Sequence, residues 1–344
     1  MPPHIYTIAP DRAFLGTLAQ GLLELAGGDP LMLPRMTVLL PTRRAARALR
    51  EAFLRLTAEG KDPGAPLLLP RLRPIGDLDD DEIGQGLGGG EGDDPSLAVP
   101  PAIPELRRRL LLTQLVLRWS KAGGEVDGEA ALLPGQAASL AAALARLLDA
   151  AASEEQSFDK LRDLVPDDLA AHWQTVLRFL EILPQRWPEI LAAEGALDPA
   201  ERRNLLLRRQ AEAWRQTPPP GPVIAAGLTG GIPALVELLS VIAWFDQGIV
   251  ILPGLDPSCD ALEWDLIIEE PAHPQHLMAL LLRALDIAPE DVREWPLRAP
   301  PAPASGREPR RRLVTEALRP AALTDAWRDL PPAPEGVLAG LTQS

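Results

Sequence analysis

Cysteine is nearly absent from this chain of 344 residues, since Cys259 is the only one. Its isolation excludes an internal disulfide and any cysteine-based zinc or iron-sulfur site within the chain. No stretch approaches the roughly 20 apolar residues of a membrane span, and the N-terminus lacks the basic and apolar regions of a secretory signal. We therefore expect a folded protein of the reducing cytoplasm that makes no contact with a membrane.

Lysine is also scarce, because only three of the 34 basic residues are lysines. This bias is typical of a GC-rich genome and indicates no particular chemistry. The net charge of −14 argues against a free-standing nucleic-acid binder, because phosphate contacts dominate the affinity of such proteins. Any contact with DNA must therefore be local, or must occur in a complex whose partner supplies a positive channel.

Hydrophobic periodicity predicts a strand, a helix, a strand and a second helix in the first 60 residues. Residues 4–8 form a β-prone run that ends at Ala9 and Pro10. The leucine spacing predicts a helix over Phe14–Leu25. Residues 36–40 form a continuous apolar run typical of a buried parallel strand. The pattern indicates the start of an α/β sheet.

Residues 62–104 are rich in turn-forming residues, and we interpret their acidic, glycine-rich part as a loop. Residues 84–89, G-Q-G-L-G-G, match the dinucleotide fingerprint as a string, but no predicted strand precedes them and acidic residues surround them. Residues 77–81 alternate like a calcium-binding loop, yet Glu82 and Gly88 stand where that loop needs glycine and glutamate. A solvated loop explains both strings better.

The chain then becomes helical from residue 104 to about residue 214. Strands are predicted over residues 222–226 and 247–254 on either side of a helix, Pro233–Trp244. This order implies a right-handed parallel unit. A further helix is predicted over residues 275–285. We therefore expect a discontinuous α/β core over residues 1–100 and 217–256, a helical insert over residues 101–216, and a partial following domain with a tail over residues 257–344.

A glycine-rich turn, G-L-T-G-G over residues 227–231, lies where a strand meets a helix. Backbone N–H groups at such a place can bind an anion, so Gly227, Thr229 and Gly230 are candidate residues of an anion-binding turn. The same turn has the outline of a nucleophile elbow, with Asp256 and His273 downstream in the order of a hydrolase. An α/β hydrolase built on Thr229, Asp256 and His273 is therefore an alternative, although threonine is a poor nucleophile there.

His273 and His276 lie close together and raise the question of a zinc site. Zinc requires three or four ligands, and the chain has only His4 and His172 in addition. We interpret the motif instead as a helix entry, with Pro274 in the first turn.

Residues 42–50, T-R-R-A-A-R-A-L-R, form the most informative stretch. They open a helix at the carboxyl end of a strand, where open α/β sheets bind their ligands. The helix brings N–H donors, a hydroxyl and four guanidinium groups to one place. Contact with a phosphate backbone is one interpretation. The other is a solvated face whose arginines pair with surface glutamates.

Five segments together resemble AddB proteins of alphaproteobacteria, and their order and spacing match that family across almost the whole chain. They are residues 38–49, 69–77, 225–234, 249–256 and 273–276. In the turn, Leu228 and Gly231 differ from the small hydroxyl residues that are usual in the family.

The resemblance implies an α/β fold with a degenerate P-loop, similar to a superfamily 1 helicase motor, in which a parallel sheet carries an inserted helical subdomain. A working motor needs G-x-x-x-x-G-K-[ST] after its first strand, to hold phosphates and magnesium. Residues 9–15 have neither the glycines nor the lysine, and residues 224–227 have no acid for magnesium. We therefore expect no ATP turnover, no catalytic residue, and no metal or cofactor in this chain.

The resemblance also implies partners. AddB acts with AddA in processing double-strand breaks for homologous recombination, and AddB proteins continue into a nuclease domain whose metal-binding acids and iron-sulfur cysteines are absent here. In related motors the loop after the second strand touches single-stranded DNA. We therefore expect a non-catalytic N-terminal portion that scaffolds an AddA-like subunit and contacts single-stranded DNA or a duplex end through Thr42, Arg43, Arg44 and Arg47. A protein-interaction module without DNA contact is a further alternative.

Overall fold

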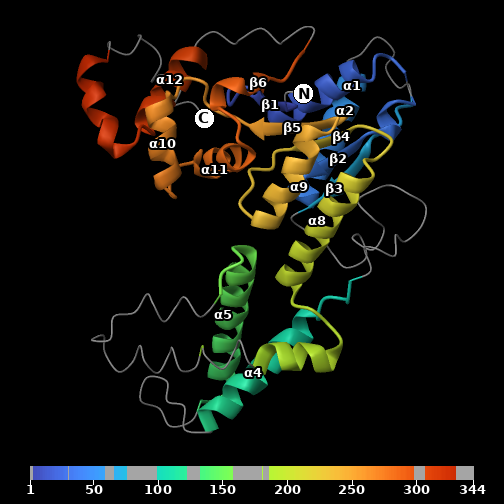
Figure 1. The fold of residues 1–344 in the computed structure, drawn as a ribbon, viewed down its shortest axis with the longest axis vertical. Helices are drawn as coiled ribbons and strands as arrows, with labels where there is room; N and C mark the ends of the chain where they lie inside the picture. The colour runs from blue at the N-terminus through green and yellow to red at the C-terminus, as the bar shows by residue number, and fades with distance from the viewer. Residues whose placement is uncertain are drawn as a thin grey trace.

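The computed structural model describes residues 3–29, 31–58, 66–75, 99–121, 132–157, 180, 186–297 and 307–330. A six-stranded sheet in the order β3-β2-β4-β5-β1-β6 forms the centre of an α/β body (Figure 1). Every strand pair in it is parallel. The strands are β1 Ile5–Ile8, β2 Thr37–Leu40, β3 Arg71–Pro74, β4 Val223–Ala226, β5 Gly248–Pro253 and β6 Arg293–Glu294. The expected α/β class with a parallel sheet is confirmed.

Helices cover both faces of the sheet, because its central strands are apolar on both sides. In β4, Ile224 and Ala226 contribute to the core beneath α1 (Phe14–Leu25) and α2 (Arg43–Ala58). Val223 and Ala225 point the other way, into the core shared with α8 (Pro199–Gln216), α9 (Pro233–Trp244) and α11 (His276–Leu285). All four of these strand residues are buried, which explains why this strand is a continuous apolar run.

A helical arm extends from the body in Figure 1 and consists of α4 (Glu105–Lys121), α5 (Pro134–Ser153) and the helical residues 186–194, with the first part of α8 beside α5. Its core contains the buried Arg108, whose Nη2 lies 2.9 Å from Asp149 Oδ1. The same Nη2 is 2.7 Å from Asp198 Oδ1, as an ion pair without hydrogen-bond geometry. Helix α8 continues into the body and packs on α9, so it connects the two parts.

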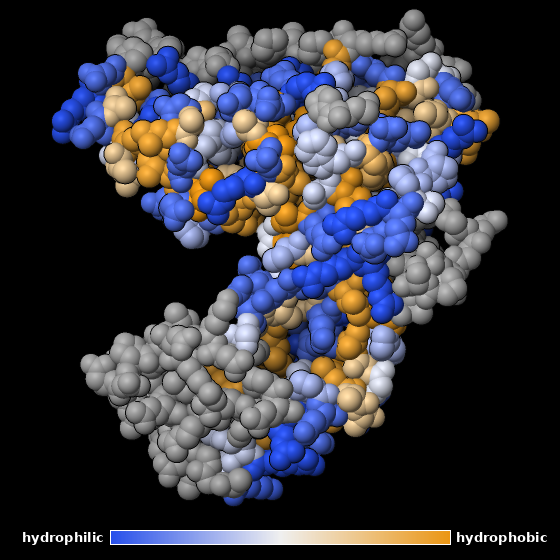
Figure 2. Space-filling model, in the orientation of Figure 1, coloured by the Kyte–Doolittle hydropathy of each residue, from blue (hydrophilic) through white to orange (hydrophobic). Residues whose placement is uncertain are grey.

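Figure 2 shows a notch between the body and the arm, bordered by the hydrophilic surface of α8. Ion pairs account for part of that surface. Arg215 Nη1 lies 2.9 Å from Glu237 Oε1 of α9, and Arg208 Nε lies 3.6 Å from Glu237 Oε2. Side chains of α8 thus fix the junction with the body through charge as well as through packing. No helix in the described part of the chain is long and apolar enough to cross a membrane.

The sheet extends further along the sequence than the ranges expected for the core. Strand β6 pairs with β1, and Trp295, which follows it, is buried against α1 and packs edge-on to Tyr6 at 5.5 Å between ring centroids. Helices α10 (Ala261–Glu269) and α11 precede β6, and α12 (Arg307–Ala317) and the 3₁₀ segment η4 (Ala321–Asp329) follow it. The division into domains remains a prediction.

Several elements were not expected from the sequence, which indicated turn-rich residues over 62–104 and, beyond residue 256, a single helix over residues 275–285. Strands β3 and β6 and helices α10 and α12 are additional to that expectation. Strand β3 lies in the supposed loop. It pairs only with β2, at the edge of the sheet, where Pro74 is tolerated because an edge strand bonds on one side. Helix α10 was missed as well, although Asp260 and Glu263 form a capping box at its start. The strings at residues 77–81 and 84–89 lie outside the described residues.

Candidate functional site

The carboxyl edge of the sheet contains two crevices where neighbouring strands send their connections to opposite faces. Strand β2 leads into α2 on one face, while its neighbour β4 leads into α9 on the other. Strand β1 leads into α1, while its neighbour β5 leads towards α10 and α11 on the opposite face. Ligands of open α/β sheets bind at such switch points. We call these places the β2/β4 crevice and the β1/β5 crevice.

Thr42 begins helix α2 at the β2/β4 crevice. Its Oγ1 accepts a hydrogen bond of 3.1 Å from the backbone N–H of Ala45, as expected of an N-cap. The hydroxyl hydrogen can still be donated to a ligand oxygen. Ala46 and Leu49 are buried against the sheet, and this fixes which face of α2 meets solvent.

The arginines of α2 lie on the solvent face of the helix. Arg43, Arg44, Arg47 and Arg50 are all exposed. Arg43 interacts with another group, whereas Arg44, Arg47 and Arg50 form no ion pair with any carboxylate in the described ranges. The interpretation in which all four arginines are neutralised by surface glutamates therefore finds no support for these three.

The glycine-rich turn lies beside this helix start. A Cβ built on Gly227 would be 3.8 Å from Cδ of Pro41, so the loops after β2 and β4 are neighbours. However, the N–H of Gly227 donates to Ile251 O at 2.9 Å, and Pro233, at the first position of α9, has no N–H to offer. Leu228 is buried in the core. The N–H of Gly227 and position 233 are therefore not available to an anion, and the role of Gly227, Thr229 and Gly230 remains a prediction.

The β1/β5 crevice opens into a cavity of about 670 Å³. The loop after β1 lines one side of it, and α12 forms its opposite wall. Thr7 holds the β5 side in position, because its buried Oγ1 donates to Leu252 O at 3.3 Å and accepts from the N–H of Leu255 at 3.0 Å. The lining residues that matter below are Ala9, Pro10, Arg12, Gly254, Asp256, Arg311, Val314, Thr315 and Leu318.

Asp256, at the end of β5, is buried and bonded by its neighbours. Its Oδ1 accepts from the N–H and the Oγ of Ser258 at 3.0 and 2.5 Å, and its Oδ2 accepts from Thr315 Oγ1 of α12. Burial by itself would raise the pKa of this carboxyl, but the hydrogen bonds from Ser258 and Thr315, with the charge of Arg311, outweigh burial and keep the pKa below its ordinary value.

Both ring nitrogens of His273 contact backbone groups at hydrogen-bond distance. The N–H of Gln275 donates to its Nδ1 at 3.1 Å, and its Nε2 lies 3.0 Å from Leu318 O, an arrangement that places the proton on Nε2. Burial lowers the pKa of this imidazole. Because neither ring nitrogen is free to accept a proton from Thr229, and Asp256 bonds elsewhere, the structure does not assemble the proposed hydrolase triad.

The motif around His273 and His276 lies at a helix entry, as expected, since α11 begins at His276. His276 Nδ1 lies 3.0 Å from Ile267 O of α10. Within the described residues, no group of three or more metal-ligating side chains comes together.

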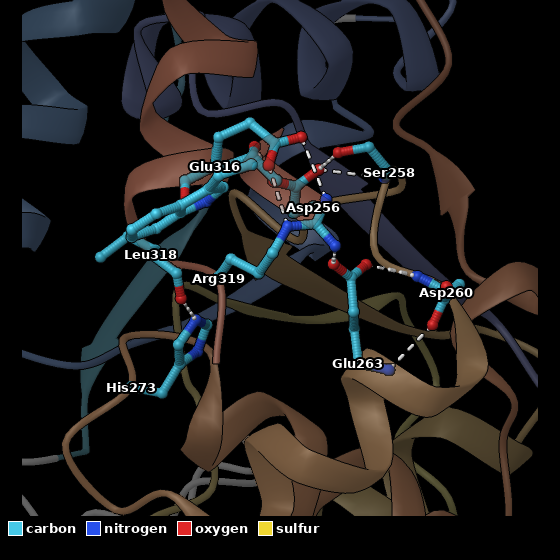
Figure 3. Close-up of polar contacts among 10 residues, drawn as sticks. Asp256, Ser258, Asp260, Glu263, His273, Glu316, Leu318 and Arg319 are labelled. Carbon is cyan, nitrogen blue, oxygen red and sulfur yellow. Dashed lines mark hydrogen bonds and ion pairs between the residues drawn. The ribbon is translucent and has the colours of Figure 1, made fainter. Parts of the chain in front are cut away.

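A cluster of charged side chains joins α10 to the C-terminal segment (Figure 3). The buried Glu263 accepts from the N–H of Asp260 at 2.9 Å with one oxygen, and its other oxygen lies 2.5 Å from Arg319 Nη1. Arg319 also pairs with Glu316 at 2.9 Å. Sequence reasoning missed this cluster. The D-x-x-E spacing of Asp260 and Glu263 was a usable signal for the cap, but no local pattern indicates the distant Arg319.

Comparisons with known proteins add no relative, since no family model and no curated protein sequence matches this chain.

Proposed function

We propose that this chain is the non-catalytic N-terminal portion of a double-strand break repair subunit similar to AddB. In this role it scaffolds an AddA-like helicase-nuclease subunit and contacts DNA during end resection for homologous recombination. The fold would be a degenerate P-loop core of the superfamily 1 helicase type, and the helical arm would be its insert. The parallel sheet, with its switch points at the carboxyl edge, is compatible with that fold.

The observation that carries the DNA contact is the solvent face of α2. Arg44 and Arg47 are exposed there without carboxylate partners in the described residues, next to a helix start capped by Thr42. Guanidinium groups and the positive end of the helix dipole both favour phosphate. Within a chain of net charge −14, such an uncompensated basic face is the local site that DNA binding would require.

The absence of catalysis in the proposal rests on the loop after β1. A phosphate-binding loop wraps a phosphate with successive backbone N–H groups and supplies a lysine. Here the N–H of Arg12 is bonded to Ala9 O at 3.0 Å, and Pro10 has no N–H. The tight turn leaves neither the donors nor the lysine that phosphoryl transfer needs.

The test is salt-dependent binding of a labelled single strand, with and without an AddA-like partner. The variant replaces Arg43, Arg44 and Arg47 by alanine and keeps Thr42, so that the helix cap stays intact. Each lost phosphate contact on a single strand should reduce the slope of log K against log salt by about 0.7. Binding should therefore become weaker and less dependent on salt.

The matched control is Arg55→Ala, which removes an exposed charge from the far end of the same helix, where Arg55 Nε donates to Glu51 O at 3.5 Å. It should leave the slope unchanged. If the wild-type chain shows no salt-dependent binding even with the partner present, the contact with DNA is refuted. A protein-interaction module would then be the better description, provided that the partner still binds.

A further inference from the structure

The C-terminal segment, residues 307–330, lies across the β1/β5 crevice and contributes Arg311, Val314, Thr315 and Leu318 to the wall of its cavity. Pro320 of the segment is buried, but several of its large apolar side chains stay exposed. Val314 is 51% exposed, Leu318 39% and Trp327 47%. Since hydrophobic stabilisation scales with the apolar area removed from water, packing contributes little to the attachment of this segment.

Polar contacts attach the segment instead. Thr315 Oγ1 donates a hydrogen bond to Asp256, and Arg319 forms an ion pair with Glu263. Leu318 O accepts a hydrogen bond of 3.0 Å from His273 Nε2. Figure 3 shows these contacts converging from α10, from the loop after β5 and from the turn before α11. All three tie the short stretch around residues 315–319 to the body.

The body-side carboxylates receive part of their bonding from the segment and the rest from the body, where Ser258 bonds Asp256 and the N–H of Asp260 bonds Glu263. Glu263 is 4% exposed and Asp256 is 7% exposed. A buried carboxylate is costly unless it is paired and hydrogen-bonded; Arg319 supplies the ion pair of Glu263, and Thr315 supplies one further hydrogen bond to Asp256. When the segment moves away, water reaches the carboxylates and the arginine together, so no charge remains buried without a partner.

We propose that residues 307–330 form a latch that closes over the cavity of the β1/β5 crevice and opens as a unit while the rest of the body stays folded. The latch controls access to that cavity from the carboxyl edge of the sheet. The inference rests on contacts at β5, α10 and α12 and does not depend on DNA binding at α2.

Cys259 reports on the latch, because it is the only cysteine in the chain and lies directly beneath it. It shares a small space of about 20 Å³ with Thr315, Leu318 and Arg319. Burial, reinforced by Asp256 and Glu263, raises the pKa of this thiol to about 12. Cys259 is partly buried while the latch is closed, and opening exposes more of the thiol to reagent and to water, so an increase in the alkylation rate reports opening.

The experiment follows alkylation of Cys259 by N-ethylmaleimide in the full-length protein at pH 8, without DNA. Thr315→Val removes the hydrogen bond to Asp256 at constant shape, and Arg319→Met removes the ion pair with Glu263. Each variant should speed alkylation by about tenfold or more. The control is Arg328→Met, whose ion pair with Asp325 lies in the same segment but is exposed at 83% and 86%; it should change the rate by less than about twofold.

Hydrogen exchange distinguishes an opened latch from general unfolding. In the wild type, amides of α12 should exchange faster than those of α11, and the two variants should accelerate α12 alone. The proposal is overturned if neither variant speeds alkylation. It is also overturned if α11 and α12 exchange together in a single step, because the segment would then belong to the cooperative core.

Discussion

The two crevices occupy equivalent places at the carboxyl edge of one sheet, yet they differ in how their charges are neutralised. At the β1/β5 crevice the buried Asp256 accepts a hydrogen bond from Thr315, and the buried Glu263 forms an ion pair with Arg319; both partners belong to the C-terminal segment. At the β2/β4 crevice the arginines face solvent, and no carboxylate in the described residues approaches Arg44 or Arg47. Within the described residues, the buried carboxylates of the first crevice are therefore bonded by the chain itself, whereas Arg44 and Arg47 at the second crevice form no ion pair with a carboxylate.

This difference shows why the topology alone does not identify a site. Both crevices fulfil the rule that ligands bind where strand connections diverge, but a crevice whose polar groups are already paired offers a ligand little electrostatic gain. Exposed cations without partners retain their capacity to bind an anion. We therefore propose the β2/β4 crevice as the place of the contact with DNA and the β1/β5 crevice as the place of the latch.

The largest expected effect concerns the glycine with a positive φ angle that follows a strand at each crevice. Gly254 and Gly227 end β5 and β4 with φ angles of 70° and 73°. A Cβ on Gly254 would lie 3.2 Å from Cβ and 3.5 Å from Cα of Pro10, which is rigid. The Gly254→Ala variant should lower the free energy of unfolding by about 2–3 kcal/mol.

Gly227→Ala is the matched comparison. Its Cβ would approach Phe14 at 3.3 Å, and that ring can move. The expected loss is about 1–2 kcal/mol, mostly from the positive φ. Urea unfolding of both variants measures the difference. A larger loss at Gly227 than at Gly254 would mean that the β2/β4 crevice is the tighter of the two, contrary to the structure.

Charge reversals, one at each crevice, compare the two crevices further and are expected to change stability less than the glycine substitutions do. Arg319→Glu places a carboxylate against Glu263 and Glu316 and should lower the free energy of unfolding by about 1–2 kcal/mol, since the latch opening limits the loss. Arg44→Glu changes an exposed side chain without a carboxylate partner and should stay within about 0.5 kcal/mol. Thermal melting of both variants tests this. Equal losses would show that the charges of the two crevices are neutralised alike.

Much of the fold could be predicted from the sequence, because its strongest elements are locally encoded. Helices α1 and α9 begin and end where the apolar period predicted, and β2, β4 and β5 are continuous apolar runs buried on both faces. Strand β3 could not be predicted in the same way. Its alternation of Arg71, Leu72 and Arg73 is short, and a proline ends it, so only pairing with β2 makes it a strand.

The candidate site also has a part that local sequence predicts and a part that depends on long-range contacts. The sequence predicted that a helix opens at residue 42, and the structure adds that Thr42 caps it by accepting a hydrogen bond from the N–H of Ala45. The contact of Arg319 with Glu263 spans 56 positions in the sequence. No spacing rule connects residues so far apart, because their meeting depends on the path of α10, α11 and β6 around the sheet. Long-range charge pairing is therefore the part that the sequence alone did not reveal.

The smallest expected effect is a pH dependence that only the β1/β5 crevice should show. The pKa of Asp256 is lower in the folded protein than the ordinary value of about 3.9 in an unfolded chain. A carboxyl with a lowered folded pKa contributes stability that is fully present above the unfolded pKa and is lost as the pH falls through the folded pKa. This contribution should therefore be complete at neutral pH and fade in acid below about pH 4.

The measurement is the free energy of unfolding from pH 7 down to pH 3 for the wild type, Asp256→Asn and Arg44→Ala. The difference between the wild type and Asp256→Asn should narrow as the carboxyl becomes protonated. The difference between the wild type and Arg44→Ala should stay constant, because a guanidinium keeps its charge throughout this range. A constant difference for Asp256→Asn would show that its bonds to Ser258 and Thr315 do not favour the ionised form, and the contrast between the two crevices would then rest on Arg319 and Glu263 alone.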